Sequence, residues 1–126
     1  MEFRRPVNLD LTKFAFPVTA IASIIHRISG VVIFLTLPLL LYFFDKSLSS
    51  EASFNRLVHL LKADLLMKLL LLMFLTALFY HLAAGVKHLL ADFGIGEELA
   101  SARLATYILI TVTFVVILLL IFYIFV

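Results

Sequence analysis

The chain has 126 residues, of which 64% are hydrophobic and 14% are charged, with a net charge of +2 and no cysteine. Soluble domains carry about 25% charged residues, so the composition excludes an ordinary soluble domain and is typical of a membrane protein. The small positive charge on short loops and helix ends reflects membrane topology and not nucleic-acid binding, and without cysteine the chain supplies no iron–sulfur ligands of the usual kind.

The first third of the chain predicts a surface arm followed by a membrane-spanning helix. Residues 1–16 are polar and basic and are expected to lie at the membrane surface. The first transmembrane helix is predicted over residues 17–44, beginning at Pro17, which suits a first helical turn, and bent by Pro38. A serine-rich loop over residues 45–53 is then expected to lead into a short surface helix.

Two further apolar stretches complete the chain. The second transmembrane helix is predicted over residues 63–93, ending at Gly94. The third is predicted over residues 104–126, which carry no charge and are expected to pack against the other helices and anchor the chain. Each stretch reaches the roughly 20 residues that a membrane helix needs. The sequence therefore predicts an all-α membrane protein, a single membrane-anchor domain over residues 1–126, whose three transmembrane helices form part of a heteromeric helical bundle.

The location of the chain follows from the distribution of its basic residues. More of them fall on the side of the N-terminus than on the other side, which favours a cytoplasmic N-terminus. The first residues lack the apolar run of a signal peptide and the composition of a transit peptide. We expect a multi-pass protein of a bacterial inner (plasma) membrane.

One face of the second helix is polar inside an otherwise apolar segment. His81, Gly85, His88 and Asp92 fall at i, i+4, i+7 and i+11, which is one side of a helix. His81 precedes Asp92 by about 16 Å along the axis, and half of a hydrocarbon core is about 15 Å. A histidine at such depth is costly and usually functional. It is either a haem ligand or a core histidine hydrogen-bonded to a neighbouring helix.

A second axial ligand for such a haem is missing from the chain. His88 lies about 10 Å along the axis from His81, so these two side chains cannot bind one iron. His26 is expected near one membrane boundary and His59 on the far surface. A six-coordinate haem would therefore need a ligand from another polypeptide.

The first helix carries a polar cluster near its start. Ser23, His26, Arg27 and Gly30 stand at i, i+3, i+4 and i+7, so they share one face where glycine permits close packing. These donors suit haem propionates or the carbonyl oxygens of a quinone, because arginine stabilises negative charge. The alternative for Arg27 is a side chain that reaches the lipid headgroups.

The sequence leaves open the roles of the polar residues at the end of the second helix. Asp92 is either a helix-end carboxylate paired with Lys87 or His88, or part of a proton relay. Neither its role nor that of His88 follows from the sequence.

These motifs together resemble a known family, the cytochrome b large membrane-anchor subunit of succinate dehydrogenase, respiratory complex II. The likeness covers nearly the whole chain in order. It rests on these segments: Arg5-Pro6-Val7-Asn8-Leu9-Asp10-Leu11, Ser23-Ile24-Ile25-His26-Arg27-Ile28-Ser29-Gly30, Tyr80-His81, Gly85-Val86-Lys87-His88 and Asp92-Phe93-Gly94.

The resemblance implies particular roles for the polar residues. His81 would be an axial ligand of haem b, with the other ligand on a second, small membrane-anchor subunit. Ser23 and Arg27 would belong to the ubiquinone site, and His26 and Arg27 would lie near the haem propionates. No catalytic residue is expected on this chain.

The resemblance also implies the rest of the assembly. A flavoprotein subunit with FAD and an iron–sulfur subunit would pass electrons from succinate to ubiquinone, and the dicarboxylate site would lie on those partners. Three other readings compete with this one: the anchor of a quinol:fumarate reductase, a haem-free structural anchor, and a proton-conducting transporter subunit. The last expects several intramembrane acids, and the sequence shows none apart from Asp92 at the boundary.

Overall fold

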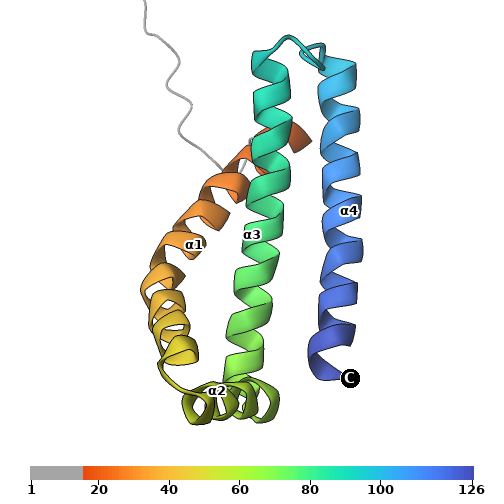
Figure 1. Ribbon diagram of the computed structural model, residues 1–126. Helices are drawn as coiled ribbons and strands as arrows, with labels where there is room; N and C mark the ends of the chain where they lie inside the picture. The colour runs from red at the N-terminus through yellow and green to blue at the C-terminus, as the bar shows by residue number, and fades with distance from the viewer. Residues whose placement is uncertain (1–15) are drawn as a thin grey trace, which may run out of the picture.

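A computed structural model describes residues 16–126, and over this range the chain is helical with no strand. It contains α1 (Val18–Ser49), α2 (Glu51–Ala63), α3 (Leu65–Asp92) and α4 (Leu99–Phe125), shown in Figure 1. The helices α1, α3 and α4 are long and apolar enough to cross a membrane. The predicted fold class is confirmed, while residues 1–15, with nearly all of the predicted arm, lie outside the described range.

The central helix of the arrangement is α3. It packs against α1 on one side and α4 on the other, and α1 contacts α4 less extensively. Figure 1 shows α3 and α4 running antiparallel beside one another, joined by the short turn that contains Gly94. That glycine has φ +78°, a left-handed conformation that ends the helix as predicted. In the same view α1 crosses α3 at a slant, and α2 lies across the opposite end of the bundle.

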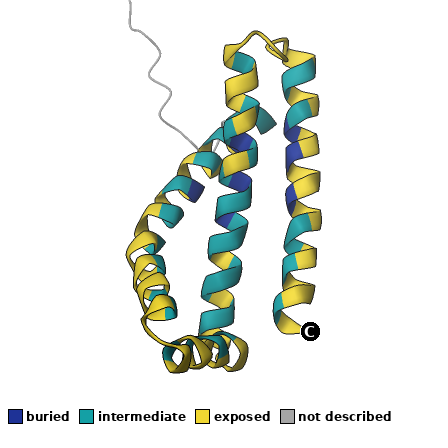
Figure 2. Ribbon diagram, viewed as in Figure 1, coloured by how far each residue is buried: buried dark blue, intermediate teal, exposed yellow. Residues whose placement is uncertain are grey.

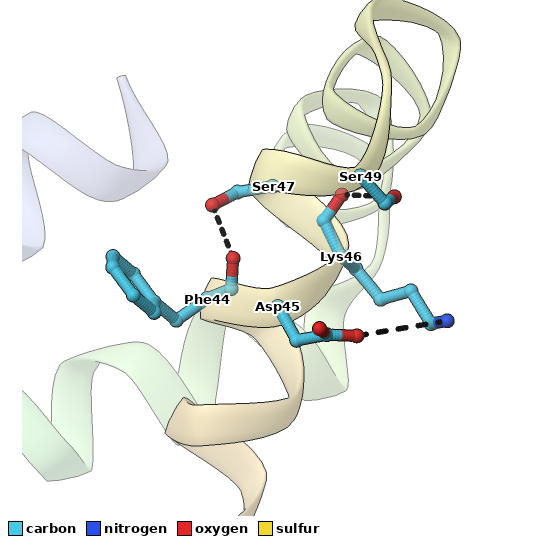
Figure 3. Close-up of polar contacts among 5 residues, drawn as sticks. All are labelled: Phe44, Asp45, Lys46, Ser47 and Ser49. Atoms are coloured by element: carbon cyan, nitrogen blue, oxygen red, sulfur yellow. Dashed lines mark hydrogen bonds and ion pairs between the residues drawn. The ribbon is translucent and has the colours of Figure 1, made fainter.

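The predicted serine-rich loop over residues 45–53 is wrong. The helix α1 continues to Ser49, and Ser50 alone is extended before α2 begins. Serine hydroxyls here bond backward within the helix, Ser47 Oγ donating to Phe44 O at 2.7 Å and Ser49 Oγ to Lys46 O at 3.0 Å (Figure 3). Local bonds of this kind let serine stay in a helix.

The other helix boundaries follow from capping. Asp64 separates α2 from α3, and its Oδ1 accepts from Met67 N at 2.9 Å, which makes it the N-cap of α3. The last helix begins at Leu99, ahead of the predicted residue 104. The residues between these two positions are helical although they are less apolar than the rest of α4. Figure 1 shows α1 bending along its length, which agrees with Pro38 inside this helix.

The core of the described chain is thin and made mostly of small side chains. Its buried residues are Ala22, Ser29, Ala77, Tyr80, Ala84, Thr106, Leu109 and Thr113. They gather in the half of the bundle nearest the α3–α4 turn, as Figure 2 shows. Small residues permit close helix contact in a membrane. The buried threonine hydroxyls bond to carbonyls of their own helix, so no polar group is left unsatisfied by their burial.

Candidate functional site

Three histidines meet where α1 crosses α3. The ring of His26 stacks on that of His81, with centroids 4.3 Å apart and planes inclined by 25°. The His26 ring also contacts that of His88, at 5.3 Å and 36°. The expectation that His26 lies apart from His81 is therefore wrong. Residue spacing gives depth along one helix only, and the slanted crossing of α1 brings His26 to the level of His81.

The protonation of the His81 ring follows from its neighbours. Its Nδ1 lies 3.2 Å from the backbone oxygen of His26 and 3.2 Å from Ser29 Oγ. A carbonyl oxygen can only accept, so the contact with His26 O requires a proton on Nδ1. In the neutral ring Nε2 then carries the lone pair, and within residues 16–126 no hydrogen bond reaches it. This is the arrangement of metal-binding histidines, whose second nitrogen donates to a carbonyl.

Glycine on α1 makes room for the His81 ring. A Cβ built at Gly30 would lie 3.0 Å from His81 Cε1 and 3.4 Å from Nδ1. On the facing helix, a Cβ at Gly85 would lie 3.7 Å from His26 Nε2, an ordinary contact. The predicted close packing beside glycine is confirmed, and it is tighter at Gly30 than at Gly85.

The imidazole of His26 has a nitrogen without a hydrogen-bond partner among the described residues. His26 Nε2 is buried and has no hydrogen-bond partner among the described residues. Leaving a buried polar atom without a partner is unfavourable by about 1–3 kcal/mol. A hydrogen-bonding group from outside these residues would relieve that penalty.

The residues of the predicted polar face of α1 lie partly against α3 and partly on the open surface of the chain. His26 and Gly30 face α3, whereas the Arg27 side chain is exposed and Ser23 is half-buried beside it. Neither Ser23 nor Arg27 makes a polar contact within the described part of the chain. Both side chains are at least partly exposed, so another molecule could reach them.

Asp92 does not form the ion pair that was one of the two alternatives for it. Its side chain is exposed, and residues 16–126 place no cation against it, neither Lys87 nor His88. His88 is exposed as well, apart from its ring contact with His26.

Two hydrogen-bonding residues beside the histidine cluster were not predicted. Ser29 is buried, and its hydroxyl donates to His26 O at 2.7 Å. Tyr80, also buried, donates its hydroxyl to Ala22 O at 2.9 Å and so ties α3 to α1 next to His81. The sequence contained a signal for the α1 side of these contacts, because Ala22, His26 and Ser29 follow the i, i+4, i+7 spacing of one helix face.

Much of the apolar surface is open in this single chain. A crevice of about 780 Å³ lies between α3 and α4 beside His88, and another of about 520 Å³, almost wholly apolar, lies between α1, α3 and α4 beside Ser29 and Tyr80. Exposed apolar side chains cover all three long helices. Such a surface fits lipid or further transmembrane helices.

Comparison with known proteins decides the family. The family model described as "Succinate dehydrogenase/Fumarate reductase transmembrane subunit" matches residues 1–120. The chain belongs to this family. The predicted resemblance to the large membrane anchor of succinate dehydrogenase is confirmed.

Relatives of this transmembrane subunit include three cytochrome b subunits of succinate dehydrogenase. The cytochrome b556 subunit of Coxiella burnetii is 44% identical, over 94% of this chain and 95% of its own length. The cytochrome b560 subunit of Reclinomonas americana is 34% identical over 90% and 82%, and the b556 subunit of Paracoccus denitrificans 30% identical over 96% and 94%. The chain is thus a membrane subunit of a respiratory oxidoreductase.

Proposed function

We propose that this subunit binds haem b through His81 Nε2 and forms part of a site where ubiquinone is reduced. The observation that carries the proposal is the contact of His81 Nδ1 with His26 O at 3.2 Å, which leaves Nε2 with its lone pair. The names of the relatives, all cytochrome b subunits, support haem as the ligand. Bound haem b supplies a one-electron redox centre.

Residues on α1 fit the anionic edge of the haem. The buried Nε2 of His26 lacks a partner among the described residues, and a propionate oxygen would accept a hydrogen bond from it. Arg27, exposed one residue further on, offers a charge-assisted bond to a carboxylate. We assign both side chains to the propionates.

A second ligand for the haem iron would come from another subunit. A metal lies in the plane of the imidazole that binds it, whereas the His26 and His81 rings are stacked with planes only 25° apart. Stacked rings direct their lone pairs side by side and not toward a common iron. We therefore propose that a small membrane-anchor subunit supplies the ligand opposite His81 and covers part of the open apolar surface.

Ser23 and Arg27 are proposed to bind the quinone. They stand one helical turn apart on the flank of α1 that α3 leaves open, and neither is engaged by the described residues. Ser23 would donate to one quinone carbonyl. Arg27 would stabilise the negative charge that develops as the ring is reduced.

The electrons are proposed to come from succinate through a flavoprotein and an iron–sulfur subunit docked on the cytoplasmic side, where the N-terminus would lie. The dicarboxylate site and FAD would belong to those partners. The direction toward quinone follows the names of the relatives, which are succinate dehydrogenases. The membrane would be a bacterial inner membrane, and residues 1–126 would act as a single anchor domain.

The test is the absorption spectrum of the complex purified through a tag on this chain. The substitution His81→Ala removes the ligand nitrogen and should abolish or strongly alter the reduced-haem band. His59→Ala, at an exposed position on α2, is the matched control and should leave the band unchanged. An unaltered band in His81→Ala would move the ligand elsewhere, first to His88.

A further inference from the structure

The hydroxyl of Ser29 on α1 lies within hydrogen-bonding distance of Nδ1 of His81 on α3. Ser29 Oγ donates its proton to His26 O at 2.7 Å. With that proton engaged, the same oxygen presents lone pairs to His81 Nδ1, 3.2 Å away. The Nδ1 proton is therefore shared between Ser29 Oγ and His26 O, which lies at the same distance.

We propose that Ser29 is a positioning residue for the haem ligand, holding the His81 ring with Nδ1 protonated and Nε2 free for iron. This inference rests on the proposed function, since it assumes that His81 binds the haem. Ser29 itself would touch neither haem nor quinone. Its effect would pass through the imidazole, whose basicity rises when its second nitrogen donates a hydrogen bond.

The surroundings of Ser29 favour a fixed geometry. Its side chain is buried, with 5% of its surface exposed, so water does not replace the hydroxyl easily. Gly30, the next residue, lies against the same His81 ring, nearest to its Cε1 and Nδ1 atoms. Neighbouring residues of α1 thus set both the position of the ring and the partner of its Nδ1 proton.

Tyr80 offers a matched control for this proposal. Its hydroxyl also makes a buried hydrogen bond from one helix to the other, to Ala22 O at 2.9 Å, but among the described residues it makes no hydrogen bond to the His81 ring. Ser29→Ala and Tyr80→Phe each remove a single hydroxyl from the α1–α3 interface. A purely structural role for Ser29 would make the two variants behave alike.

The experiment uses the purified complex and two measurements on its haem. In Ser29→Ala, transfer of haem to excess apomyoglobin should be about tenfold faster than in the wild type, the lower end of the effect seen when the hydrogen-bond partner of a metal-binding histidine is lost. The haem midpoint potential should rise, because a less basic imidazole stabilises ferric iron less. Tyr80→Phe should lower the thermal midpoint of the complex without changing either haem property.

The possible outcomes separate this inference from the function on which it rests. A wild-type complex without haem, or His81→Ala with a normal haem band, would refute the proposed function. A haem that depends on His81 but is unchanged in Ser29→Ala would refute the positioning role alone. Equal shifts in Ser29→Ala and Tyr80→Phe would also refute it, since they would show a general loosening of the interface.

Discussion

The imidazole of His81 lies against the backbone of Gly30 on the neighbouring helix, so closely that a Cβ at this glycine would stand 3.0 Å from His81 Cε1. Real Cβ atoms essentially never approach another atom more closely than this. An added side chain would therefore require the His81 ring to move by a few tenths of an ångström. The position of the proposed haem ligand thus depends on the absence of a side chain at residue 30.

We predict that Gly30→Ala lowers the affinity of the complex for haem by about tenfold, because disturbed support of a metal-binding histidine typically costs 10- to 100-fold. The effect should appear although alanine favours the helix over glycine by about 1 kcal/mol. Haem content per complex, measured by absorbance, checks this. Gly85→Ala is the control, since its Cβ would meet His26 Nε2 at an ordinary 3.7 Å. Equal haem loss in both variants would contradict the prediction.

The isolated chain should not form a stable six-coordinate haem site. The His26 ring stacks on that of His81 and is tilted against that of His88, and stacked rings do not direct their lone pairs toward one iron. Expressed without its partners, the subunit should yield apoprotein or aggregate, given its exposed apolar surface. Electron paramagnetic resonance and absorbance of the purified chain check this. A stoichiometric low-spin haem would overturn the two-subunit site.

Arg27→Leu should lower quinone reduction by on the order of 100-fold, the lower end of the loss when one charge-stabilising donor is removed. Succinate oxidation with an artificial acceptor that takes electrons upstream should remain nearly intact. Arg56→Leu is the control, because Arg56 lines a crevice between α1 and α2, at the opposite end of α1 from Arg27. If both activities fell together in an assembled Arg27→Leu complex, this arginine would be structural.

A prediction independent of any cofactor concerns the start of α3. Asp64→Ala removes the side-chain bond to Met67 N and should destabilise the helix by about 1 kcal/mol, the usual effect of losing an N-cap. The thermal midpoint of the complex should fall, and Asp64→Asn, which keeps the capping oxygen, should restore most of it. Ser47→Ala, which loses only an exposed bond within α1, should be nearly neutral. A fall in Ser47→Ala as large as that in Asp64→Ala would argue against the cap.

Hydropathy and turn chemistry alone determined the outline of this protein. Long apolar runs require helices in a membrane, because no water is present to satisfy the backbone. They predicted three spans, and Gly94 marked the end of the second one. The same patterns place His81 as a polar group among apolar neighbours, a position typical of a haem ligand in a membrane helix.

Tertiary structure alone decided which residues surround His81. Helical spacing fixes the angle and depth of a residue on its own helix, but the crossing and rotation of neighbouring helices depend on how small residues such as Ala22 and Ala84 pack between them. That packing places His26 on His81, brings Ser29 to its Nδ1 and leaves Arg27 exposed. No periodicity within a single helix contains this information, because each contact joins residues more than 50 positions apart.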